Sequence, residues 1–167
     1  MSRVASFPPL VGSAPRVLIL GSMPGVKSLQ AGQYYAHPQN GFWPILGTYC
    51  GFAADLPYEA RCRALVGRGI AVWDVLQSCE RKGSLDTAIV ATTERPNDLA
   101  GFCASFPTLR GILCNGAKAA ATLTRCRSSL SAALEVVALP STSPAHTLAR
   151  AEKARRWHEA LARFLTP

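Results

Sequence analysis

Four short apolar runs alternate along the chain with longer segments of mixed polarity, and this alternation is its main organising pattern. Apolar runs of this length, bounded by Gly, Pro and Asn, predict buried strands. Strands that alternate with helices predict a parallel sheet covered on both faces. We therefore expect one α/β domain over residues 1–167, a three-layer α/β/α sandwich with a short, mainly parallel four-stranded sheet. The predicted strands are residues 17–20, 70–76, 109–116 and 134–139.

The segments between these runs carry helical signals. Asn97 is placed to cap one helix, and Trp157, Leu161 and Phe164 form an apolar stripe on the last one. Three stretches, residues 1–16, 26–39 and 80–96, lack clear periodicity and are expected to be loops. The predicted helices are residues 40–52, 57–69, 97–107, 117–126 and 147–165.

Charge and cysteine content narrow the class of protein. The net charge of +8, with only 17% charged residues, favours a polyanionic partner such as nucleic acid, although a basic pI alone is weak evidence. No apolar run reaches the ~18 residues of a membrane span, and the N-terminus has no apolar block typical of a signal peptide. We expect a cytoplasmic protein. The six cysteines form no CxxC pair, so we expect reduced thiols and no metal or cofactor.

Candidate chemistry lies where the predicted strands end, because parallel sheets carry their functional loops beyond the carboxyl ends of the strands. The three unusual ends are "GSMPG", "CNG" and "PSTSPAHT". They contain no Walker A motif and no GxSxG elbow, and the three histidines are scattered. Asp74 and Asp86 are the only acids near such ends. Charged catalysts are therefore scarce, and attention moves to the aromatic segment "YYAHPQNGFW" at residues 34–43.

Three segments, in this order, resemble the uracil-DNA glycosylase superfamily: "VLILGSMPGVKSLQAGQYYAHPQNGFWPIL", "GIAVWDVLQSCERKGSLDTAI" and "LPSTSPA". Within it the chain is most similar to the hypoxanthine-DNA glycosylase (DNA-deoxyinosine glycosylase) branch, which is related to the mismatch-specific uracil/thymine glycosylases. The likeness spans about residues 16–165. It implies the glycosylase-like α/β/α fold and a monomeric, cofactor-free, monofunctional enzyme. Such an enzyme flips a deaminated base, hypoxanthine first, out of double-stranded DNA and hydrolyses its N-glycosidic bond.

One departure from the mismatch-specific pattern moves the expected catalytic group. That branch has its catalytic Asn where this chain has Met23, and a thioether cannot hold a water for attack on the sugar. The hypoxanthine branch uses the Asn of its His-Pro-x-Asn segment, which implies that Asn40 is catalytic here. A neutral amide orients water but is too weak a base to deprotonate it fully. Asn40 could alternatively cap the following helix, or do both.

The resemblance also implies roles for the other loops. Tyr35 matches the aromatic residue that stacks on the flipped base, with core packing as the alternative. Gly21, Ser22 and Met23 would line the base pocket, and Ser141 would hydrogen-bond the departing base. The loop after the last strand would enter the minor groove. The residues expected at the DNA are Lys27, His37, Thr142, Ser143, Pro144, Ala145 and His146.

Some roles stay open at this point. Arg150 and Lys153 are expected to add positive charge near the DNA, and Asp86 either aids a water or caps a turn. Ala145 stands at the wedge position and is small for that role. Two other functions remain: a mismatch-specific uracil/thymine glycosylase, against which Met23 argues, and a non-catalytic nucleic-acid-binding relative, against which Asn40 argues.

Overall fold

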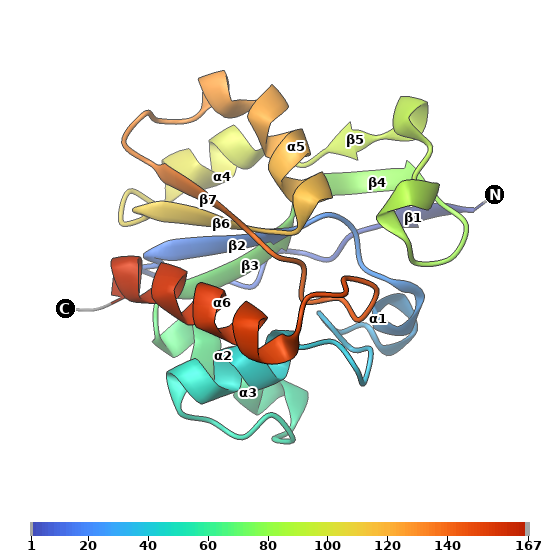
Figure 1. Cartoon of the computed structure of the whole chain (residues 1–167). Coiled ribbons are helices and arrows are strands. Elements are labelled where there is room, and N and C mark those ends of the chain that lie inside the picture. The colour runs from blue at the N-terminus through green and yellow to red at the C-terminus, as the bar shows by residue number, and fades with distance from the viewer. Residues whose placement is uncertain (1, 166–167) are drawn as a thin grey trace.

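Four parallel strands form the central sheet of the computed structural model, which describes residues 2–165. Their order is β3-β2-β6-β7 (Figure 1). The middle strands β2 and β6 are fully buried, as their unbroken apolar runs require. The four-stranded parallel sheet predicted from the sequence is confirmed. The strands are β2 (Val17–Gly21), β3 (Ile70–Asp74), β6 (Gly111–Asn115) and β7 (Glu135–Leu139).

Helices cover both faces of this sheet (Figure 1). On one face lie α2 (Phe42–Cys50), α3 (Tyr58–Gly67) and α6 (Arg150–Leu165), and on the other lie α4 (Leu99–Ser105) and α5 (Ala117–Arg125). Each face has its own apolar cluster, and the α6 stripe of Trp157, Leu161 and Phe164 is buried in the first. The three-layer sandwich is confirmed. Within residues 2–165 no helix combines the length and apolarity that crossing a bilayer requires.

A second sheet, antiparallel and in the order β1-β4-β5, was not predicted. It joins β1 (Arg3–Ala5), β4 (Leu76–Glu80) and β5 (Arg95–Pro96). The prediction of one strand over residues 70–76 was wrong, because the chain leaves the central sheet after Asp74 and continues as β4. Both partners of β4 come from segments expected to be loops. Pairing between segments so far apart leaves no local period in the sequence.

Several helix boundaries differ from the predictions. A short helix, α1 (Val26–Ala31), lies in a segment expected to be a loop, and single 3₁₀ turns occupy residues 86–88, 91–93 and 127–129. The cap of α4 is Asp98 rather than Asn97, and the Asp98 carboxylate accepts the N–H of Gly101 at 2.9 Å. The Asn97 amide instead donates to the main-chain oxygen of Asp74 at 2.8 Å and fixes the end of β3.

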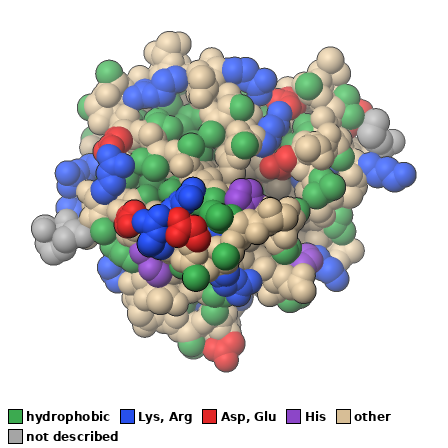
Figure 2. Space-filling model, viewed as in Figure 1, with side chains coloured by type: hydrophobic (Ala, Val, Ile, Leu, Met, Phe, Trp, Pro, Cys, Tyr) green, Lys and Arg blue, Asp and Glu red, His purple; other side chains and the backbone are tan. Residues whose placement is uncertain are grey.

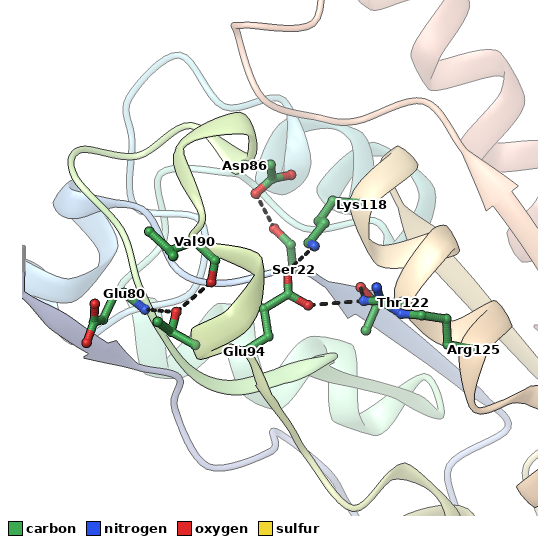
Figure 3. A network of polar contacts seen from close by, with 9 residues as sticks. Ser22, Glu80, Asp86, Val90, Glu94, Lys118, Thr122 and Arg125 are labelled. Atoms are coloured by element: carbon green, nitrogen blue, oxygen red, sulfur yellow. Dashed lines mark hydrogen bonds and ion pairs between the residues drawn. The ribbon is translucent and has the colours of Figure 1, made fainter.

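Glu94 links the second sheet to helix α5. Just before β5, its carboxylate accepts from Lys118 and, at 3.0 Å, from Arg125, both on α5 (Figure 3). The Glu94 side chain is 9% exposed, so this pair of contacts is better shielded than an ordinary surface ion pair. The loop between β4 and β5 is thereby anchored at its far end, and its near end borders the site described next.

Candidate active site

A cleft of about 640 Å³ lies beyond the carboxyl ends of the central strands. This is where a parallel sheet carries its functional loops, as predicted from the sequence. It is bounded by the last residues of three strands, Gly21 of β2, Asp74 of β3 and Asn115 of β6, and by the segment after β7. The structure brings every residue expected at the site to this one cleft. These residues are Gly21, Ser22, Met23, Lys27, Tyr35, His37, Asn40, Ser141, Thr142, Ser143, Pro144, Ala145 and His146.

Asn40 combines a contact to the start of α2 with a free donor. Its Oδ1 accepts the main-chain N–H of Phe42, the first residue of α2, at 2.9 Å, although the cap residue of this helix is Gly41. Only the oxygen of an amide can accept an N–H, and this contact therefore also identifies which end is the NH₂. The NH₂ remains for a ligand in the cleft. The neighbouring Gly41 N–H donates to the Thr142 carbonyl at 2.9 Å and ties this segment to the loop after β7.

Tyr35 is held in an uncommon backbone conformation. Its φ is 55°, and among residues 2–165 no other non-glycine residue has a positive φ. For an L residue this conformation costs about 1–2 kcal/mol. The ring stacks on Phe42, with centroids 3.9 Å apart and planes at 18°, which stabilises the conformation. Phe42 and Trp43 are buried in the core, whereas Tyr35 is half-buried and lines the cleft.

The turn after β2 is fastened to the loop that follows β4. The Ser22 hydroxyl donates to Asp86 Oδ1 at 2.6 Å (Figure 3), and the N–H of Val26 donates to Ser84 Oγ at 2.9 Å. The buried Arg81 guanidinium donates to main-chain oxygens on both segments, at 2.6 and 2.8 Å. Asp86, whose role the sequence left open, thus accepts from a residue of the first turn. These contacts make one wall of the cleft from segments about sixty residues apart in the chain.

Thr142 is not placed to touch a phosphate with its side chain, contrary to expectation. It is 2% exposed, and its hydroxyl accepts from Asn115 Nδ2 at 3.0 Å. Asn115 Oδ1 in turn accepts the N–H of Thr142 at 2.9 Å. Both ends of the Asn115 amide are therefore used to hold the loop after β7 on the end of β6. Sequence patterns singled out "CNG" without indicating this pairing.

Lys153 likewise holds the loop rather than adding charge at the DNA. It is 5% exposed, and its Nζ donates to the carbonyls of Ser143 at 3.1 Å and His146 at 2.8 Å. Burial, and then the positive charge of Arg150, lower the pKa of its ammonium group. The loop closes in a turn from the Ser143 carbonyl to the His146 N–H, so α6 begins at Arg150 and not at residue 147. Pro144, as expected for a DNA-contacting tip, is exposed with Ala145 and His146.

We expect Lys153→Met to weaken duplex binding about tenfold, equivalent to ~1.4 kcal/mol, because the loop loses two charge-assisted hydrogen bonds that fix its shape. Fluorescence anisotropy with a duplex containing an abasic-site analogue measures the affinity. Lys82→Met removes the same charge from an exposed position and serves as the control. An equal loss in both variants would show that only net charge matters and would contradict a positioning role.

Asp74 is a cleft residue whose role the sequence did not indicate. It is 4% exposed, and no partner among the described residues hydrogen-bonds its Oδ2. A Cβ on the adjacent Gly21 would lie 2.6 Å from Asp74 Oδ1 and 2.9 Å from the Tyr35 hydroxyl, so only glycine leaves room for this pair. Burial first, and then the negative charge of Asp86, raise the pKa of Asp74 to about 7, against the opposing charge of Arg81. The detectable signal was an acid inside the apolar run "IAVWDVL".

Positive charge is spread over the surface rather than gathered in one patch on the visible face (Figure 2). Over α6, acidic and basic side chains are mixed, since Arg155 and Arg156 pair with Glu152 and Arg155 also pairs with Glu159. Near the cleft, Lys27 is exposed on α1. His37 is half-buried, and its Nδ1 accepts the N–H of Gln39 at 3.1 Å, which leaves Nε2 for other contacts.

Comparisons with known proteins agree with this site. A family model described as the uracil DNA glycosylase superfamily matches residues 8–164. Two relatives named hypoxanthine DNA glycosylase are each 38% identical to this chain. The one from Methanosarcina barkeri aligns over 113 residues, 67% of this chain and 70% of its own. The one from Methanosarcina acetivorans aligns over 114 residues, 68% of this chain and 71% of its own.

The solved structures include a similar one of nearly the same extent. It is the solution NMR structure of a proposed uracil DNA glycosylase from Methanosarcina acetivorans, with a TM-score of 0.83 and 30% sequence identity. The match covers 98% of this chain and 99% of that one. The family resemblance carried by the motifs is therefore confirmed over the whole fold and not only at the cleft. The chain belongs to the uracil DNA glycosylase superfamily and is a DNA glycosylase of that superfamily.

Proposed function

We propose that this glycosylase removes hypoxanthine from double-stranded DNA: it flips deoxyinosine into the cleft and hydrolyses the N-glycosidic bond to leave an abasic site. The two relatives named hypoxanthine DNA glycosylase support this substrate. The proposed nucleophile is water, so the enzyme is monofunctional. The proposed catalytic residue is Asn40, and the departing base lies among Gly21, Ser22, Met23, Tyr35 and Ser141.

The observation that carries the proposal is the free NH₂ of Asn40. Two carboxamides line the cleft, and Asn115 uses both of its ends on Thr142. Met23, on the first turn, has no hydrogen-bonding group suited to water and is buried in the apolar cluster beneath α4 and α5. The Asn40 NH₂ makes no hydrogen bond to another described residue, and the side chain is held at its other end by the N–H of Phe42. A donor whose position is fixed before binding needs no reorganisation during the reaction.

The proposed reaction depends more on the placement of neutral groups than on charged side chains. The Tyr35 face opposite Phe42 is the surface on which a flipped base stacks, a contact worth about 1–3 kcal/mol. The Asn40 NH₂ donates to the attacking water or to a base acceptor, and the Ser141 hydroxyl supports the negative charge that grows on the departing base. Ser141 Oγ accepts the N–H of Ser143 at 3.1 Å, so its own proton is free to be donated.

DNA binding is proposed to involve the rims of the cleft. The exposed tip from Pro144 to His146 fills the space left by the flipped nucleotide, and Ala145, with its small side chain, makes it a weak wedge. Lys27 and His37 also line the cleft and are candidate phosphate contacts. The net charge of +8 supports a general attraction to the backbone.

The test uses duplexes that each contain one deoxyinosine, one deoxyuridine or one G:T mismatch. We expect release of hypoxanthine, with strand cleavage only after alkali treatment, because no lyase step follows the hydrolysis. Excision of uracil or thymine without hypoxanthine would instead assign the mismatch-specific activity. A protein that binds these duplexes and cuts none of them would be a non-catalytic relative, and strand cleavage without alkali would contradict a monofunctional mechanism.

A further inference from the structure

A buried carboxyl group lies in the wall of the cleft and has no role in the steps above. Asp74 ends β3, and its carbonyl oxygen is held by the Asn97 amide, so the backbone that carries it is fixed. The side chain is 4% exposed and lines the cleft, yet its Oδ2 makes no hydrogen bond to any described residue. A polar group kept buried without a partner costs about 1–3 kcal/mol, and sites that retain one call for an explanation.

The groups around Asp74 favour its neutral form. Tyr34 and Tyr35 face it from the segment before α2. Asp86 contributes a negative charge from the loop after β4. Arg81, the cation that acts on Asp74, directs two of its nitrogens to main-chain oxygens rather than to this carboxylate. Burial is the largest of these influences, and together with Asp86 it outweighs Arg81, so the neutral form of the carboxyl group is favoured.

We propose that Asp74 is a further catalytic residue, the general acid that protonates the departing base. The inference rests on the proposed function and deepens it, because it assigns a proton donor to the purine. Its basis is geometric: a buried carboxyl group in the cleft wall, with an oxygen that no described residue hydrogen-bonds, beside a glycine that leaves it room. The other acid of the cleft, Asp86, is exposed and already accepts from Ser22, so it does not fit the role.

The step is balanced without any further reagent. As the C1′–N9 bond breaks, its electron pair moves onto the purine, and the Asp74 O–H bond breaks to give a proton to a ring nitrogen, N7 or N3. The base departs as neutral hypoxanthine and Asp74 becomes a carboxylate. Water adds to C1′, and the proton it releases returns to the carboxylate directly or through solvent. General acid catalysis of this kind contributes about 10²–10⁴-fold to a rate.

The direction in which the excision rate changes with pH follows from the proposal, because the protonated form of Asp74 is the active one. Burial and the charge of Asp86 raise the pKa of Asp74 to about 7. The group is protonated below that pH and ionised above it, so the excision rate should fall as the pH rises through about 7. Asp86→Asn removes the neighbouring negative charge, lowers the pKa of Asp74 and should move this falling limb to lower pH.

The experiment is single-turnover excision of deoxyinosine from a duplex, from about pH 5 to about pH 9, with Asp74→Asn as the main variant. The amide has the shape of the neutral acid but no transferable proton. We expect the excision rate of this variant to be about 100-fold lower than that of the wild type at low pH, and no longer to fall as the pH rises through about 7. Asp55→Asn, in an exposed loop away from the cleft, is the matched control and should behave as the wild type. Circular dichroism and the melting temperature verify that Asp74→Asn is folded.

A second substrate separates proton donation from simple base binding. In 7-methyl-deoxyinosine the purine already carries a positive charge and leaves neutral without a proton. The defect of Asp74→Asn should therefore shrink from about 100-fold to less than about threefold on this substrate. An equal defect on both substrates would assign Asp74 to binding or packing and overturn the inference.

Three other outcomes would overturn the inference. An Asp74→Asn enzyme that keeps the wild-type excision rate and its fall above about pH 7 would overturn the inference while the proposed function stands. A wild-type rate that rises with pH through about 7 would do the same, because it would require the ionised form. Failure of the wild-type enzyme to release hypoxanthine at any pH would overturn the proposed function itself, and with it the inference.

Discussion

Asn40→Ala should lower the single-turnover rate of hypoxanthine excision by about 10²–10³-fold, the usual effect of removing one positioned donor from an active site. The reason lies in the two ends of its amide: Oδ1 accepts the N–H of Phe42, and the NH₂ is the end left for a ligand in the cleft. Alanine removes both. Quench-flow or manual sampling with enzyme in excess over a deoxyinosine duplex measures the chemical step without product release.

Asn40→Asp separates the two ends. A carboxylate keeps an acceptor for Phe42 and suits the N-terminus of α2, so the melting temperature should stay near the wild-type value. It has no NH₂ to donate, so the rate should stay as low as that of the alanine variant. Full activity of Asn40→Asp would show that the NH₂ is not needed for catalysis.

Gly21→Ala should reduce excision by about 100-fold while leaving the protein folded. The added Cβ would lie 2.6 Å from Asp74 Oδ1 and 2.9 Å from the Tyr35 hydroxyl, distances that force at least one of these groups to move. Because Gly21 is adjacent to Asp74 across the β2–β3 pair, the displacement occurs at the cleft itself. The single-turnover rate and the affinity for a deoxyinosine duplex, measured together, show whether chemistry or binding is lost.

Gly67→Ala provides the control for that substitution. At the end of α3 a Cβ would meet no heavy atom within 4 Å, and its φ is not in the left-handed region. Replacing such a glycine stabilises a fold by about 0.4–1 kcal/mol through the unfolded state. Excision should therefore be unchanged and the melting temperature equal or higher. A similar loss of activity in both variants would point to a general effect of the mutations rather than to the packing around Gly21.

The central sheet was predictable because its signals are local. Each strand is an uninterrupted apolar run next to a turn residue, and the stripe on α6 repeats with helical spacing. The second sheet was not predictable by the same means. Its strands are three, five and two residues long, and β4 pairs with segments whose positions depend on the finished fold. The end of β3 at Asp74 is likewise set by its hydrogen-bonded surroundings and not by any break in hydrophobicity.

The candidate site was also predictable only in part. The loops that line the cleft could be named from strand ends and motif spacing, and all of their expected residues lie there. What each side chain does could not be read from spacing. Thr142 lies in the loop after β7 and Lys153 in α6, and only their burial and partners show that they hold the backbone of this loop. For Asp74, the informative facts are enclosure and a missing partner, which are properties of the folded protein.

None of the described residues that line the cleft comes from the last helix, yet this helix fastens the loops on its side of the cleft. Arg150 donates to the carbonyl of Gln39 at 3.0 Å, Lys153 holds the Ser143 and His146 carbonyls, and Trp157 Nε1 donates to that of Pro140 at 2.9 Å. In a genetic screen for loss of repair, missense mutations should therefore also accumulate in α6. Such alleles would leave every residue of the cleft unchanged, and sequence comparison restricted to the motifs would score them as harmless.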